Sequence, residues 1–259
     1  MPELPLEAIL LLVGAALLAG VVDAVVGGGG LIQLPALLIA FPGVPPVQLL
    51  ATNKVGSIAG TSMASVTYYR RVHPDLKTAI PLAAAAFAGS AGGALVASRI
   101  PRAAFDPIVL VALLVVGAYV VFKPEVGRVE DLRLDGRSHY LSAVAIGAGI
   151  GFYDGALGPG TGSFLVFALV GWLGYAFLEA SAKAKIANFA TNLAALVIFV
   201  PQGAVMWKYG LMIAGANLVG GYLGARVAVA RGVAFIRVVF IVVVVALALK
   251  IGFDVATRA

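Results

Sequence analysis

The sequence of 259 residues contains no cysteine and only two histidines, His73 and His139. Without cysteine there is no disulfide, no thiol catalysis and no thiolate metal site. Two histidines, both expected in loops, cannot form a three-histidine zinc site, and the helical zinc motif H-E-x-x-H is absent. We therefore expect no metal, no other cofactor and no catalytic residues.

Charged residues are also scarce, at 12% of the chain, against about 25% in an ordinary soluble domain. Hydrophobic residues make up 61%, and the mean hydropathy is +1.04. Apolar runs of about 18 or more residues recur, and each is long enough to span a membrane as a helix. These numbers predict an all-α integral membrane protein whose side chains are covered mainly by lipid.

The net charge of +6 does not favour a nucleic-acid partner, because the basic residues lie mostly in short loops between apolar runs. No Lys or Arg precedes Lys54. A cleavable signal peptide needs a basic segment at its start, so we expect the first apolar run to be retained as a helix.

Ten apolar segments separate along the chain. Segments two and seven are short or broken, and both follow glycine-rich runs, so we expect 8–10 helices. The segments cover residues 6–26, 30–41, 48–69, 77–98, 104–122, 139–156, 161–177, 181–203, 209–230 and 233–251.

The two halves of the chain match at a constant offset of 131 positions. The match includes charged residues, which are rare here. Because each half has five segments, an odd number, the second half must enter the membrane in the opposite sense, which predicts an inverted-topology repeat. We expect a first repeat over 1–122, a polar connecting loop over 123–138 and a second repeat over 139–259. The matching pairs are Asp23 with Asp154, Gly27 with Gly158, Gly29 with Gly160, Lys54 with Lys185, Lys77 with Lys208, Gly89 with Gly220 and Gly93 with Gly224.

Loop charges predict the orientation. Most loop Lys and Arg residues, including those at 70–77, 123–137 and 226–231, fall on one side if every segment crosses. The side richer in basic residues is normally cytoplasmic. We therefore expect a multi-pass protein of the bacterial cytoplasmic (inner) membrane with both termini outside.

The glycine-rich breaks are the first candidate site. Broken helices in a membrane are tolerated only inside protein or beside a water-filled cavity. A helix that restarts there directs N–H groups and a partial positive charge at the cavity, which suits an anion. Close helix packing is the alternative reading of these glycines. The candidate residues are Gly28, Gly29, Gly30, Gly160, Thr161 and Gly162.

Two lysine-bearing helix faces are the second candidate. On a helix, Lys54, Ser57 and Thr61 share one face, and Asn53 adjoins it. Lys185, Asn188 and Asn192 form the equivalent face in the second half. An ammonium beside neutral hydrogen-bonding groups can hold a compact oxyanion, although lysines near segment ends can instead extend to the membrane surface.

Asp23 and Asp154 each precede a break by four residues. Carboxylates within a membrane are candidates for proton relay or ion coupling. The alternative is a structural ion pair, Asp23 with Lys54 and Asp154 with Lys185, and both roles could coexist if protonation of the aspartate releases the lysine.

At these residues the chain resembles the TauE/SafE (TSUP) sulfite exporter family of membrane transporters. The resemblance rests on Asp23 to Gly30 followed by Pro35, on Ala51 to Thr61, on Gly89 to Gly93 and on their repetition in the second half. It implies export, or in some members uptake, of small sulfur-containing or organic anions such as sulfite, sulfoacetate, taurine-related sulfonates and thiosulfate. Coupling to an ion gradient, with protons as the expected ion, is implied rather than ATP hydrolysis. The second half departs from the pattern, with Pro159 and Thr161 where Gly28 and Gly30 stand.

The leading hypothesis is thus a secondary transporter of small anions that works by alternating access. A passive anion channel is the alternative. An intramembrane enzyme is disfavoured because no nucleophile with a matching base stands out. The expected partners are a small anion and the lipid bilayer, without nucleic acid, and a homodimer is left open.

Overall fold

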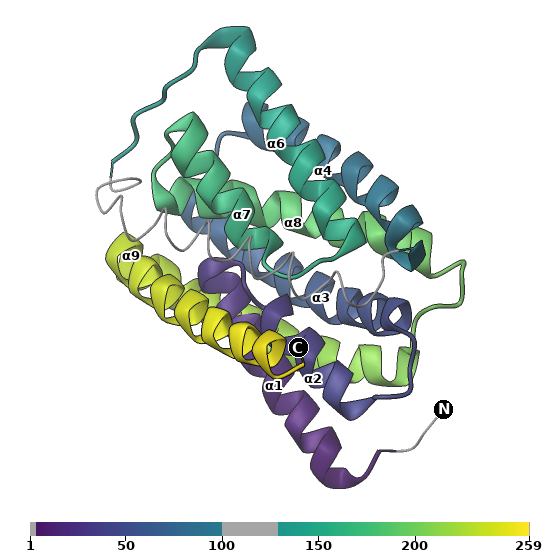
Figure 1. Ribbon diagram of the computed structural model, residues 1–259. Coiled ribbons are helices and arrows are strands. Elements are labelled where there is room, and N and C mark those ends of the chain that lie inside the picture. Colours follow the sequence, from purple (N-terminus) through teal and green to yellow (C-terminus); the bar gives the residue numbers. More distant parts are fainter. Residues whose placement is uncertain (1–3, 100–128, 259) are drawn as a thin grey trace.

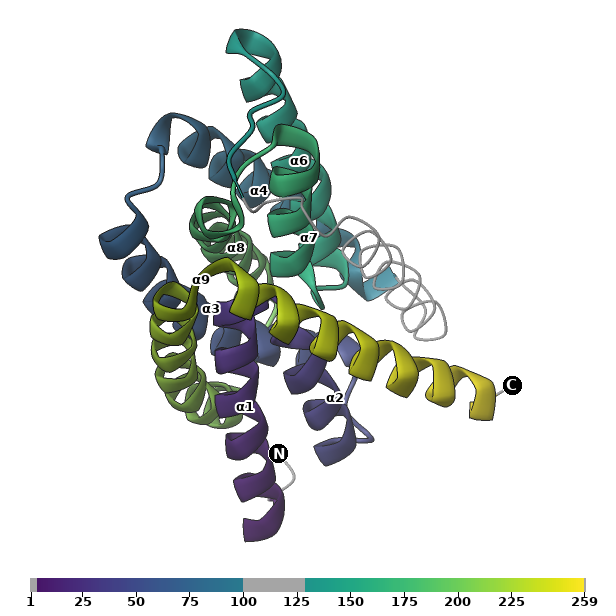
Figure 2. The same ribbon diagram turned by 90° about the vertical axis from the view of Figure 1, so that its left-hand side faces the viewer.

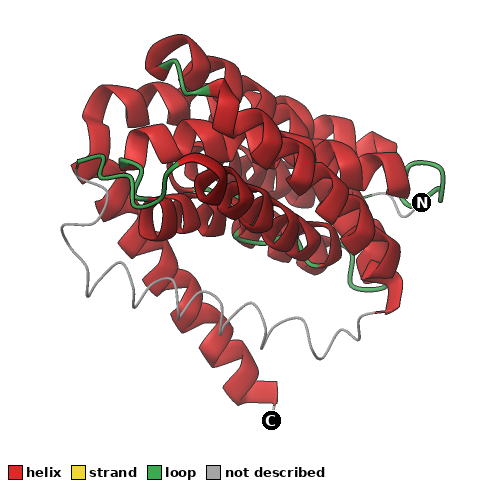
Figure 3. Cartoon of the chain, turned by 90° about the horizontal axis from the view of Figure 1, so that it is seen from above, coloured by secondary structure: helices red, strands yellow, loops and turns green. Residues whose placement is uncertain are grey.

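The structure, a computed structural model, describes residues 4–99 and 129–258. Helices dominate both ranges, and no strand occurs in either (Figure 3). The expected all-α architecture is confirmed. In chain order, the elements are α1 (Leu6–Val26), α2 (Gly30–Ala40), α3 (Pro46–Val72), α4 (Leu76–Val96), the 3-10 turn η1 (Ala97–Arg99), α6 (Gly136–Ala156), α7 (Thr161–Ala168), the π-helical turn η2 (Leu169–Leu173), α8 (Phe177–Phe199) and α9 (Trp207–Arg258), as Figure 1 shows.

α9 contains a break at Gly232, whose φ of 68° and ψ of −163° are not helical. α9 therefore comprises two helices, which correspond to the predicted segments 209–230 and 233–251. The predicted segment 104–122 lies outside the described residues, as does the beginning of the connecting stretch 123–138. Among the described residues, four helices are long and apolar enough to cross a membrane, namely Leu6–Val26, Leu76–Val96, Phe177–Phe199 and Trp207–Gly232.

The surface of the helix bundle is apolar while its interior holds charge. Leu10, Leu11 and Leu211 are each more than half exposed. Lys54 and Lys185, by contrast, are both only 1% exposed. Water would favour the opposite distribution, so the molecule fits a surrounding of lipid, with its polar groups gathered inside.

Two short hairpins of broken helix define the centre. α1 ends at Gly27, whose φ of 84° is left-handed and whose N–H donates to the Asp23 carbonyl at 2.7 Å. α2 then folds back along α1 (Figure 2). Gly158 and Gly160, with φ of 90° and 83°, reverse the chain in the same way between α6 and α7.

The tips of the two hairpins touch. The Ser163 N–H donates to the Gly27 carbonyl at 3.3 Å, and the Ser163 hydroxyl donates to the Val26 carbonyl at 2.6 Å. A Cβ at Gly27 would lie 2.2 Å from the carbonyl carbon of Gly162. Only glycine permits this approach, so the two breaks act as one unit at the centre of the molecule.

The most extensive helix packing joins the first half of the chain to the second. α1 packs against α9, α4 packs against α6, and α3 packs against α8 (Figures 1 and 2). Small residues allow the close contacts. A Cβ at Gly20 would lie 2.4 Å from the Asn217 carbonyl oxygen, and one at Gly155 would lie 2.0 Å from that of Ser90. The halves are therefore interleaved.

Candidate functional site

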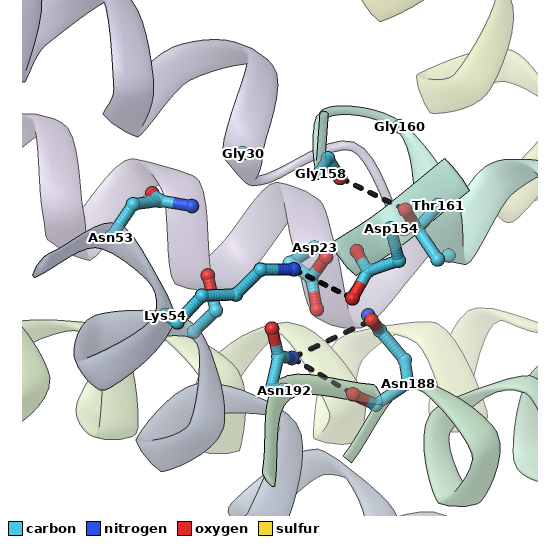
Figure 4. Close-up of a pocket in the computed structure, with 13 residues that line it drawn as sticks. Asp23, Gly30, Asn53, Lys54, Asp154, Gly158, Gly160, Thr161, Asn188 and Asn192 are labelled. Atoms are coloured by element: carbon cyan, nitrogen blue, oxygen red, sulfur yellow. Dashed lines mark hydrogen bonds and ion pairs between the residues drawn. The ribbon is translucent and has the colours of Figure 1, made fainter. Parts of the chain in front are cut away.

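A small polar cavity lies where the two hairpin tips meet α3 and α8 (Figure 4). Its volume of about 10 Å³ leaves room for roughly one water molecule. Eleven of the fifteen predicted site residues line it. They are Asp23, Gly30, Asn53, Lys54, Ser57, Asp154, Gly160, Thr161, Gly162, Asn188 and Asn192.

The other four predicted residues lie close by but do not line the cavity. The Gly29 N–H donates to Asp23 Oδ1 at 3.4 Å, and the Gly28 carbonyl accepts from the Leu31 N–H. Lys185 lies behind Asp23. Thr61 donates its hydroxyl to the Ser57 carbonyl on its own helix at 2.8 Å, so it turns away from the cavity.

Lys54 forms a buried ion pair across the cavity. Its Nζ lies 2.6 Å from Asp154 Oδ2, and the two side chains are 1% and 2% exposed. This contact, drawn as a dashed line in Figure 4, joins α3 to α6. Such burial excludes the alternative in which Lys54 extends to the membrane surface.

Lys185 forms the second ion pair. Its Nζ lies 3.3 Å from Asp23 Oδ2 and also donates to the main-chain carbonyl of Asp23. The contact joins α8 to α1. Asp23 is 13% exposed, so this pair is looser and more open than the first.

Each ion pair joins a residue of the first half of the chain to a residue of the second half. Pairing within each half, of Asp23 with Lys54 and of Asp154 with Lys185, is wrong. The cause is the insertion of each hairpin tip beside the other half: a Cβ at Gly158 would lie 3.2 Å from Leu50 and 3.5 Å from Lys54 Nζ. The end of α6 thus lies over the lysine face of α3.

The helix restarts offer fewer free N–H groups than the sequence indicates. In α2, the N–H groups of Leu31 and Ile32 already donate to the carbonyls of Gly28 and Gly29 at 3.1 and 3.0 Å. In α7, the Ser163 N–H is bound by Gly27. The positive ends of both helices still face the cavity, but Lys54 is the main cationic group that lines it.

Several neutral polar groups remain available around the cavity. Asn53 Oδ1 is buried without a hydrogen-bond partner in the described part of the chain. Asn192 donates to the Asn188 carbonyl at 2.8 Å and thereby fixes the two amides side by side on α8 (Figure 4). Buried polar atoms usually have a partner, so an orphaned acceptor in a cavity indicates a place for water or a ligand.

Sequence reasoning missed Gln33 and Asn217, which support the cavity from behind. Gln33 Nε2 donates to the Asn53 carbonyl at 3.3 Å, and Gln33 Oε1 accepts from Asn217 Nδ2. Both side chains are buried. The signal was present, since each is an isolated amide in an apolar segment, and such residues seek partners in a membrane.

A second buried polar cluster lies away from the cavity, around His139. His73 ends α3 in a turn, as expected, but His139 is helical and buried in α6, so its assignment to a loop is wrong. His139 Nε2 lies 2.8 Å from the Tyr175 hydroxyl and 3.2 Å from the Thr78 hydroxyl. Those partners come from distant segments, and they fix the first turn of α6 against α4.

Lys183 belongs to the same region and is fully buried. It pairs with Glu179 one helical turn away and lies 4.2 Å above the Tyr175 ring. Burial, the largest influence, raises the pKa of Tyr175 to about 12, so this hydroxyl stays protonated and can donate. The cluster therefore links the starts of α4, α6 and α8.

In chemical terms, the cavity region holds two ammonium groups and two carboxylates. Their charges balance, and each is satisfied by a partner from the other half. A small anion can displace a carboxylate from an ammonium group, and a proton can neutralise the displaced carboxylate. Across the described ranges, no cluster of three His, Cys, Asp or Glu side chains could hold a metal ion.

Comparison with known proteins gives one consistent answer. The family described as "Sulfite exporter TauE/SafE" matches residues 12–251. The chain is 38% identical to the probable membrane transporter protein ORF9 of Sinorhizobium sp, over 98% of this chain and 96% of that protein. No solved structure matches it.

Two further relatives cover nearly the whole chain. A probable membrane transporter protein of Haemophilus influenzae is 35% identical over 96% of this chain and 95% of its own length. The probable membrane transporter protein YfcA of Escherichia coli K12 is 32% identical over 92% and 87%, respectively. The chain therefore belongs to the TauE/SafE sulfite exporter family, a family of membrane transporters and not of enzymes.

Proposed function

We propose that the chain is a secondary transporter that exports a small anion, sulfite or an organosulfonate such as sulfoacetate or a taurine-related compound, by alternating access. The carrying observation is the pair of crossed, buried Lys–Asp contacts at the meeting point of the two broken hairpins. Buried lysines in a membrane protein mark a substrate or ion pathway. The sulfur chemistry follows from the family name.

The inverted repeat is part of this proposal. The 131-residue offset relates α1 to α6, α2 to α7, α3 to α8 and α4 to the first part of α9. The hairpins α1–α2 and α6–α7 approach the centre and touch there, and their restarted helices both line the cavity. This arrangement is typical of transporters in which two related halves surround one central site.

The small volume of the cavity favours a transporter over a passive channel. Roughly one water molecule fits, and both ion pairs bridge the halves. An anion must break contacts to enter, so binding and conformational change are coupled. Protonation of an aspartate would release a lysine for the anion, which links the transport to protons and not to ATP.

The lysines give the direct test. We expect Lys54→Ala and Lys185→Ala each to weaken sulfite binding roughly 10- to 100-fold, since each removes a charge-assisted contact. Thermal stability of the purified protein, titrated with sulfite, measures this, because a ligand stabilises the folded state that binds it. Lys77→Ala, which changes an exposed lysine at the start of α4, is the matched control.

Wild-type affinity in both cavity variants would remove the lysines from the site. A parallel series with taurine, sulfoacetate and acetate would define the anion class. In proteoliposomes, sulfite inside should accelerate uptake of labelled sulfite, because a transporter exchanges its substrate. Flux without such stimulation would identify a channel.

A further inference from the structure

The two ion pairs differ in ways that bear on coupling. Lys54 and Asp154 are 2.6 Å apart and almost fully buried. Lys185 and Asp23 are 3.3 Å apart, and Asp23 keeps a 13% exposed side chain at the cavity. The positions that the 131-residue offset relates, Asp23 with Asp154 and Lys54 with Lys185, therefore occupy different environments.

Resting on the proposed function, we infer that Asp23 alone takes up the coupled proton, whereas Asp154 stays ionised against Lys54 throughout transport. Protonating Asp23 changes the net charge of the four buried groups from zero to one positive charge. That charge matches one monovalent anion. The binding of one monoanion would then be linked to the binding of one proton at Asp23.

Asp23 can lose its charge without leaving Lys185 unsatisfied. The Lys185 ammonium also donates to the main-chain carbonyl of Asp23, and that bond does not depend on the carboxyl charge. The remaining N–H groups of Lys185 become available to an anion beside Asn188 and Asn192, which stand on the same face of α8.

Asp154 has no such freedom. The described part of the chain gives the Lys54 ammonium no partner besides Asp154 Oδ2. Neutralising Asp154 would leave a buried ammonium uncompensated, which is strongly unfavourable. The pair also holds α3 to α6, so it serves as a fixed contact between the halves.

The groups around Asp23 support its titration. Lys185 faces it from α8, and the Gly29 N–H reaches Oδ1 from the hairpin tip at only 3.4 Å. From α3, the Tyr68 hydroxyl donates to the Ala24 carbonyl at 3.0 Å. Lys54, also on α3, lies across the cavity and is paired with Asp154 of α6. No residue of α2, α7 or α9 that lines the cavity is ionisable. Oδ1 is therefore weakly bound and can accept a proton.

The test compares Asp23→Asn with Asp154→Asn in the full-length protein. The apparent affinity for sulfite is measured by thermal stabilisation between about pH 5.5 and pH 8.5. Sulfite itself titrates, but equally for every protein, so the differences between proteins report the protein's own proton. One linked proton changes the affinity by about tenfold per pH unit.

We expect Asp23→Asn to lack this tenfold-per-unit component, because the amide imitates a permanently protonated carboxyl. Asp154→Asn should bind more weakly but keep the wild-type pH slope. If Asp154→Asn fails to fold, the double variant Lys54→Gln with Asp154→Asn replaces it, because that variant removes both charges together. Its sulfite affinity should also keep the wild-type pH slope.

A wild-type slope in Asp23→Asn overturns the inference, as does loss of the slope in Asp154→Asn or the double variant. In those cases sulfite still stabilises the wild type, and the proposed function stands. Absence of sulfite-dependent stabilisation in the wild type overturns both.

Discussion

At the scale of single residues, Gly27 shows how the centre depends on backbone geometry. Its φ of 84° disfavours any side chain, and a Cβ there would overlap the backbone of Gly162. The residue both ends α1 and allows the other hairpin tip to lie against it. Its place in the sequence indicated the break, but only the fold reveals the neighbour.

We expect Gly27→Ala to destabilise the protein by at least about 2 kcal/mol, because backbone strain and overlap each cost about 1–3 kcal/mol. Gly14→Ala is the matched control in the same helix, where a Cβ meets nothing within 4 Å. Alanine should stabilise that position by about 0.5–1 kcal/mol. Thermal unfolding in detergent distinguishes the two, and equal melting temperatures would contradict the role of Gly27.

The cavity residues were largely predictable from the sequence because charge is rare in this chain. Lys54, Lys185, Asp23 and Asp154 stood out by composition and by their common offset. The choice of partner could not be predicted. It depends on which hairpin tip lies over which helix, and no local pattern encodes a contact between α3 and α6.

At the scale of elements, the helix boundaries differ most where distant segments intervene. The predicted segment 161–177 ends early, with η2 at Leu173, and α8 starts at Phe177 and not at 181. Gly174 turns the chain with a φ of 86°, and its carbonyl accepts from the Asp131 N–H at 2.8 Å. The connecting stretch thus fixes this turn, which hydrophobicity alone cannot indicate.

Asp75 caps the start of α4. Its carboxylate accepts hydrogen bonds from the Lys77 and Thr78 N–H groups at 2.9 and 3.2 Å. Partial burial raises the pKa of Asp75, but hydrogen bonds from Thr78 and Lys77, with the nearby Lys183 ammonium, lower it by more. The net shift is downward. The charged cap therefore stabilises the fold at neutral pH.

We expect Asp75→Ala to lose about 1 kcal/mol of stability at pH 7. Because the pKa of Asp75 is lower in the folded protein, its contribution is complete above about pH 4 and declines as the pH falls through the folded-state value. The wild type and the variant should therefore converge in acid. Asp135→Ala is the control, since Asp135 begins α6 without a side-chain cap. A difference independent of pH would contradict the capping role.

At the scale of the whole molecule, interleaving decides how the parts can move. α1 packs with the first part of α9, and α4 packs with α6. In the proposed alternating access, a rocking motion cannot separate the described helices of the first half from those of the second half as two rigid bodies. The moving units would instead be mixed groups of helices from both halves, joined by the Lys54–Asp154 and Lys185–Asp23 contacts.

We expect neither half to fold alone, because each would expose the glycine-lined faces that the other half covers. Cutting the chain within 123–138 and expressing both parts together should restore a complex. Copurification through a tag on one part, followed by a sulfite thermal shift, measures this. A stable, monodisperse first half expressed alone would contradict the interleaved packing.

The same packing imposes an order on biogenesis. α1 is complete at Val26, but its partner begins only at Trp207. At about 5–20 residues per second, the ribosome needs on the order of 10 to 40 s to supply that partner. Until Asp154 and Lys185 have been synthesised, Lys54 and Asp23 stand in the nascent chain without the residues that neutralise them. The membrane-insertion machinery must shelter both charges until the second half arrives, so early termination should leave a fragment for quality-control proteases.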